Sequence, residues 1–182
     1  MDDPANLGQY ILLVVLIAMS AFFSASETAF SSVNKIRLKN YTSDGNRKAE
    51  RALKIAEDFD RMLSAILIGN NIVNIASASI GTVIFTKMFG AAGAAVSTVV
   101  MTVLVLIFGE ILPKSYAKQN SEKVTMNFSA PLNVIMVVLT PLVWIFTKLQ
   151  SIVKSKKGEE DTPSVTQEEL KFIIEEIEDE EE

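Results

Sequence analysis

The 182-residue sequence lacks two residue types entirely, since it contains no histidine and no cysteine. Without them there is no disulfide framework, no thiol nucleophile and no common zinc or copper site. Serine–histidine and cysteine–histidine catalytic pairs are excluded as well. Most enzymes and transition-metal proteins are thereby ruled out, and any cation site in this chain must use oxygen ligands.

Charged residues are also scarce over four long stretches, although they make up 21% of the chain. Hydrophobic residues, 49% of the total, are concentrated in these stretches. Each is near or above the roughly 20 residues that a helix needs to cross a bilayer. The pattern predicts an all-α, multi-pass protein of the plasma membrane. We expect spans at about 10–30, 62–88 and 91–117, followed by a juxtamembrane helix at about 121–153.

The net charge of −5 comes from one acidic segment at residues 159–182. The rest of the chain is slightly basic, so the overall charge says little about partners, and we expect no nucleic acid to bind. Thr166 and Glu169 have the spacing of a capping box, which predicts a helix start. We expect residues 1–153 to form a membrane domain and residues 154–182 to form a linker and an acidic helix that leads into a further domain.

The basic residues orient the predicted spans. A group of them lies between the first two spans: Lys35, Arg37, Lys39, Arg47, Lys48, Arg51, Lys54 and Arg61. By the positive-inside rule this loop is cytoplasmic, so the N-terminus lies outside and the C-terminus lies in the cytoplasm after three crossings. The turn sequence Asp44-Gly45-Asn46 predicts a short helical hairpin within the loop.

The fourth apolar stretch has lysines on both flanks, and a single crossing cannot leave both flanks in the cytoplasm. It also contains Pro131 and Pro141, each of which removes a helical hydrogen bond. We interpret it as a kinked belt helix that lies along the inner interface or re-enters from it. The alternative is a fourth true span.

The first span contains a polar cluster in which Ser24, Glu27 and Ser31 share one helix face, with Ser26 close by. Polar groups in lipid are costly and usually face a cavity or a partner. The ordinary explanation is that the serines bond to their own helix and that Glu27 reaches the cytosol.

A second polar cluster, in the second span, consists of Asn70, Asn71 and Asn74, with Asn70 and Asn74 on one face. Hydrogen bonding between helices accounts for it as readily as a binding site does.

The third cluster is Gly109-Glu110-Ile111-Leu112-Pro113-Lys114. Pro113 has no amide hydrogen, so it frees the carbonyl of Gly109 directly beside a carboxylate. With amide and hydroxyl oxygens from other helices, this makes the all-oxygen set that hard cations such as Mg²⁺ and Na⁺ prefer. The alternative is a proline kink in which Glu110 pairs with Lys114 on the same helix.

Taken together, three motifs in this order resemble the membrane domain of the CNNM/CorC family: Ser24-Ala25-Ser26-Glu27-Thr28-Ala29, Gly69-Asn70-Asn71-Ile72-Val73-Asn74 and Gly109-Glu110-Ile111-Leu112-Pro113-Lys114. The resemblance implies three spanning helices with a belt helix, a homodimer, and Mg²⁺ export driven by Na⁺. It also implies that the acidic helix leads to paired CBS domains. Few helices per chain and the small residues Gly81 and 91–94 agree with dimerisation.

We therefore predict one Mg²⁺ per protomer. The expected ligands are Ser24, Ser26, Asn70, Asn71, Asn74, Gly109 and Glu110, with Glu27, Pro113 and Lys114 in structural or gating roles. Two other classes of function remain open. The chain could be a membrane anchor for cytosolic domains, or a pore, although no polar stripe runs the length of a span. An enzyme is the least expected class.

Overall fold

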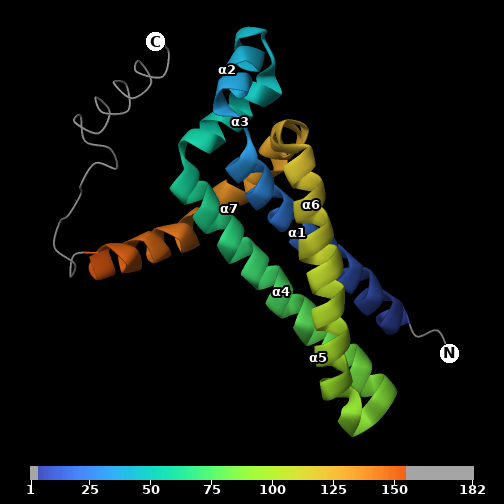
Figure 1. The fold of residues 1–182 in the computed structure, drawn as a ribbon. Coiled ribbons are helices and arrows are strands. Elements are labelled where there is room, and N and C mark those ends of the chain that lie inside the picture. Colours follow the sequence, from blue (N-terminus) through green and yellow to red (C-terminus); the bar gives the residue numbers. More distant parts are fainter. Residues whose placement is uncertain (1–3, 155–182) are drawn as a thin grey trace, which may run out of the picture. The chain divides into compact units, whose positions relative to one another are not determined.

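The computed structural model describes residues 4–154, and every regular element in that range is a helix. The elements are α1 (Pro4–Ser32), α2 (Lys35–Ser43), α3 (Arg47–Glu57), α4 (Phe59–Phe89), η1 (Gly90–Ala92), α5 (Gly93–Leu104), η2 (Val105–Ile111), α6 (Leu112–Gln119) and α7 (Ser121–Lys154) (Figure 1). The all-α class is confirmed for these residues. Three segments are long and apolar enough to cross a membrane: Leu7–Ser32, Phe59–Gln119 and Ser121–Ile145. The acidic helix expected after Thr166 lies outside the described residues.

Helices α4 and α5 form a tight hairpin, which turns at Gly90 with a φ of 60° (Figure 1). At Gly93 a Cβ atom would lie 2.4 Å from the Thr86 Cα and 2.5 Å from the Phe85 carbonyl oxygen, so only glycine fits. Gly81 allows a similar approach by Met101. The sequence predicts that small residues here serve contacts between two copies. In the structure, these two glycines serve a contact within one chain.

We expect Gly93→Ala to lower the melting temperature by about 4–8 °C, because forcing an atom against backbone costs roughly 2 kcal/mol. Thermal unfolding in detergent measures the effect. Gly8→Ala is the matched control, since a Cβ there would have nothing within 4 Å. Equal melting temperatures for the two variants would contradict the close approach of α4 to α5.

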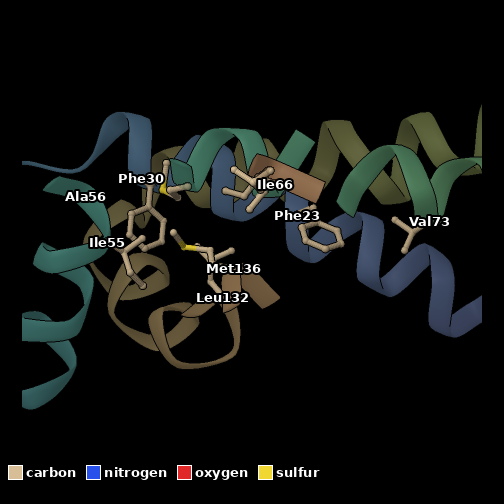
Figure 2. Close-up of a cluster of buried hydrophobic side chains, with 11 residues drawn as sticks. Phe23, Phe30, Ile55, Ala56, Ile66, Val73, Leu132 and Met136 are labelled. Carbon is tan, nitrogen blue, oxygen red and sulfur yellow. The ribbon is translucent and has the colours of Figure 1, made fainter. Parts of the chain in front are cut away.

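Helix α1 lies between α4 on one side and η2 with α6 on the other. The buried hydrophobic cluster that joins α1 to α4 includes Phe23, Phe30 and Ile66 (Figure 2). Gly69 lets α4 approach α1 closely, because a Cβ there would lie 2.4 Å from the Phe23 ring. This packing fixes α1 and α4 at the level where their polar residues meet.

The loop between α1 and α4 forms the short helices α2 and α3, which turn at Gly45 with a φ of 81°. Asn34 and Asn46 cap the two helices, and each side-chain oxygen accepts two backbone N–H groups. Arg37 joins the hairpin to α7 through a 2.8 Å ion pair with Glu122, which raises the pKa of Arg37. The cytoplasmic location of this hairpin stays a prediction.

Helix α7 is one helical element that contains both Pro131 and Pro141. Leu132, Met136 and Val143 are buried in the cluster with α1 and α4, and Figure 2 shows Leu132 and Met136 beside Ile55 of α3. Its other side exposes a run of apolar residues: Val134, Val137, Val138, Leu142, Trp144 and Ile145. A belt position at the inner interface stays a prediction.

Candidate functional site

The centre of the candidate site is a contact between Ser20 of α1 and two asparagines of α4. The Ser20 Oγ lies 2.7 Å from the Asn74 Oδ1 and 3.2 Å from the Asn70 Oδ1, and Ser20 is fully buried. A hydroxyl has one proton, so it donates to only one amide oxygen at a time. The other oxygen keeps its acceptor capacity for a different partner.

The third wall of the site is η2, a π-helical segment that contains Gly109 and Glu110. Here the Leu112 amide donates to the Ile107 carbonyl, five residues back, and no longer to that of Phe108. The next amide that could reach Phe108 in this register belongs to Pro113, which has no hydrogen. The sequence predicts a freed carbonyl at Gly109. The π register adds the carbonyl of Phe108.

Gly109 itself lies against Ser20, since a Cβ at this position would be 2.8 Å from the Ser20 Oγ. A side chain here would push α1 away from η2. Glycine at 109, which is itself buried, therefore allows Ser20 to approach η2 closely.

Ser24 is placed by the contacts on either side of it. Ser20 meets Gly109, and Glu27 pairs with Lys114 at 3.2 Å, so α1 and α6 run in the same direction and Ser24 lies between the two contacts. The Ser24 Oγ is buried and has no hydrogen-bond partner among the described residues. An unpaired buried hydroxyl is costly, and this one lies one helical turn beyond Ser20, toward the Glu27–Lys114 pair.

Two predicted ligands lie apart from this group. Ser26 is buried, but its hydroxyl donates to the Phe22 carbonyl at 2.7 Å. Two residues of α-helix turn a side chain by about 200°, so Ser26 points away from Ser24. Asn71 is exposed, one residue from Asn70 and on a different face. The structure thus brings Asn70, Asn74 and Gly109 together around Ser20, and it places Glu110 with Asn74 in one cavity wall. Ser24 lies one helical turn further along α1, and Ser26 and Asn71 lie outside the group.

Glu110 is half-buried, and its ion pair with Lys114, the alternative interpretation of the third motif, does not form. Lys114 pairs with Glu27 of another helix instead. Glu110 and Asn74 line a cavity of about 340 Å³ between α4 and the α5–η2 rod. The only carboxylate in the cavity wall therefore faces open space.

The cavity extends from Glu110 toward the hairpin end of α4 and α5. Its lining residues are Asn74, Ala78, Thr82, Ser97, Thr98, Met101, Thr102, Val105, Leu106 and Glu110. Sequence reasoning overlooked the hydroxyl residues of this wall, and it overlooked Ser20. A signal was present in both cases, since Thr98, Thr102 and Glu110 repeat at intervals of four or eight, and Ser20 lies four residues before Ser24.

Comparisons with known proteins identify the family of the chain. The family model described as cyclin M transmembrane N-terminal domain (CNNM) matches residues 11–182. The chain is 39% identical over 179 residues to the UPF0053 protein of Haemophilus influenzae, covering 97% of this chain and 43% of that protein. It is 37% identical over 162 residues to the UPF0053 inner membrane protein YfjD of Escherichia coli, covering 87% of this chain and 38% of that protein.

The chain thus spans less than half the length of the curated relatives that it matches. The family model nevertheless covers almost all of the chain, including all three polar motifs. With three segments able to cross a bilayer, the chain is a multi-span membrane protein. It belongs to the CNNM family, of which it is the transmembrane domain.

Proposed function

We propose that this chain binds Mg²⁺ between α1, α4 and η2 and exports it across the cell membrane in exchange for Na⁺. The observation that carries the proposal is the convergence of oxygen atoms from three helices at one level, around a single carboxylate that has no ion pair among the described residues. Mg²⁺ is the transported substrate, and no catalytic role is assigned to any residue.

The proposed ligands follow from the contacts around Ser20. They are the Ser24 hydroxyl, the amide oxygens of Asn70 and Asn74, the carbonyls of Phe108 and Gly109, and the Glu110 carboxylate. Mg²⁺ takes about six oxygens at ~2.1 Å, and water supplies the positions that the protein leaves open. A bare ion with one carboxylate keeps a net positive charge, which suits a site that must also release it.

The arrangement in the membrane is part of the same proposal. The basic α2–α3 hairpin lies in the cytoplasm, the N-terminus lies outside, and α7 lies along the inner interface as a belt. Two copies form a dimer, because a half-buried carboxylate on a bundle this small needs further shielding from lipid. In a longer protein, CBS domains after the acidic segment at residues 159–182 would regulate transport.

A membrane anchor without transport activity is the second function to test. In that case the asparagines and Ser20 would serve only helix packing, which their mutual hydrogen bonds also satisfy. Within residues 4–154, Ser24 has no hydrogen-bond partner for its hydroxyl and Glu110 has no ion pair. Both observations favour transport, since helix packing alone requires neither group.

The two functions differ in a flux experiment. We expect the purified chain in liposomes to move Mg²⁺ against its gradient when a Na⁺ gradient is imposed, and to stop when Na⁺ is equal on both sides. A dye that reports Mg²⁺ inside the vesicles gives the rate, and vesicles without protein give the background. Rates at the background level under every gradient would favour the anchor.

A further inference from the structure

The cavity between α4 and the continuous α5–η2 helix, which Asn74 and Glu110 help to line, is called the groove below. We propose that this groove is the outer half of the cation pathway, a water-filled passage that binds the partly hydrated ion between Glu110 and the outer surface. This inference rests on the proposed function, because it assigns the route by which the ion bound at Glu110 leaves.

The groove begins at the site and ends near the hairpin turn. At its inner end Asn74 and Glu110 belong both to the groove and to the candidate site. At its outer end lie Thr82 and Ser97, whose hydroxyl oxygens are 3.4 Å apart. From Glu110 to Thr98 the rod covers roughly 18 Å at 1.5 Å per residue, more than half of a ~30 Å hydrocarbon core.

The three threonine hydroxyls in the groove donate hydrogen bonds to the helix backbone. Thr82 donates to Ala78 at 2.9 Å, and Thr98 donates to Ala94 at 3.0 Å. Thr102 donates to the carbonyl of Thr98 at 2.6 Å. The oxygens of Thr98 and Thr102 therefore turn only lone pairs toward the groove, whereas Thr82 and Ser97 share a contact in which either hydroxyl can donate. Acceptor oxygens of this kind attract a hard cation and its water.

Such backbone bonding is common in membrane helices and does not make a passage by itself. Ser79, for example, donates to Ile75 in the same way, yet it does not line the groove. What distinguishes Thr82, Thr98 and Thr102 is that they line one cavity that ends at a carboxylate.

The size of the groove suits a hydrated ion. Its volume of about 340 Å³ holds on the order of ten waters at ~30 Å³ each. Mg²⁺ gives up its water reluctantly, so a space in which it regains a partial shell lowers the barrier to release.

Cysteine accessibility tests the groove directly, because the chain contains no cysteine and each introduced thiol is the only one. Thr98→Cys and Thr102→Cys place a thiol in the groove. Val99→Cys and Val103→Cys place it on the same helix outside the groove, at positions that are 66% and 49% exposed. The probe is a positively charged, membrane-impermeant methanethiosulfonate applied to the reconstituted chain. We expect the thiols at positions 98 and 102 to react at least ten times faster than those at positions 99 and 103. Added Mg²⁺ should slow the reaction of the groove thiols.

A second measurement keeps transport separate from binding. The double substitution Thr98→Val with Thr102→Val keeps the side-chain size and removes the oxygen atoms. It should lower Mg²⁺ flux at least five-fold while calorimetric Mg²⁺ affinity stays unchanged. Ser79→Ala, the control outside the groove, should leave both unchanged.

The outcomes separate the two proposals. If Glu110→Gln leaves Mg²⁺ binding intact, the proposed function fails. If Glu110→Gln removes binding, two results would contradict the inference about the groove alone. In the first, the groove thiols react no faster than the thiols at Val99 and Val103. In the second, the groove thiols of two copies cross-link, which would mean that the groove is a closed contact between copies.

Discussion

Glu110→Gln is expected to weaken Mg²⁺ binding at least about 100-fold, which corresponds to roughly 3 kcal/mol. The substitution keeps the shape of the side chain and one oxygen, but it removes the only carboxylate that faces the cavity. At low dielectric the attraction between a divalent ion and a carboxylate far exceeds that of a neutral amide. Calorimetric titration of Mg²⁺ into the purified protein gives the dissociation constant.

Glu50→Gln is the matched control for this change of charge. Glu50 is exposed on α3 and pairs with Lys54 at 2.8 Å, outside the candidate site. The Glu50→Gln variant should bind Mg²⁺ as tightly as the unaltered chain does. Unchanged affinity in Glu110→Gln would mean that the carboxylate has a structural role and that the site lies elsewhere.

Pro113→Ala should reduce Mg²⁺ affinity at least about ten-fold although it removes no side-chain ligand. Alanine restores an amide hydrogen that can donate to the carbonyl of Gly109 or Phe108, and a carbonyl already bonded is a poorer ligand. The same bond should make the metal-free protein more stable by about 1 kcal/mol. Calorimetry and thermal unfolding without Mg²⁺ measure the two effects, which have opposite signs.

Pro141→Ala provides the comparison, because Pro141 also lies inside a helix but belongs to α7. It should stabilise the protein without changing Mg²⁺ affinity. The hypothesis of backbone ligands fails if Pro113→Ala is more stable and still binds Mg²⁺ normally.

The sequence predicts much of this architecture because hydropathy and turn residues act locally. The apolar stretches correspond to α1, α4, α5 with η2, and α7, and Asp44-Gly45-Asn46 lies at the turn between α2 and α3. In a bilayer every spanning backbone must satisfy its own hydrogen bonds, which leaves helices as the simplest solution.

The details of the site depend on contacts between helices, and these are harder to read from one sequence. Spacing favours Glu110 as the partner of Lys114, whereas packing of α6 against α1 brings Glu27 to it. Ser20 lies inside an apolar run and resembles an ordinary small residue until α4 places Asn70 and Asn74 beside it. The π register likewise depends on packing, since the same residues could form an α-helix with a kink at Pro113.

The π segment also determines which helices the continuous helical stretch from α5 through η2 to α6 can contact. A turn closed by an i→i+5 bond holds one residue more than an α-helical turn, so it delays the rotation of side chains about the axis. Helix α5, which precedes the π segment, packs on α4, whereas η2 and α6 pack on α1. A substitution that winds η2 into an α-helix would therefore rotate all of α6, and it would carry Lys114 away from Glu27, well beyond the residue that was changed.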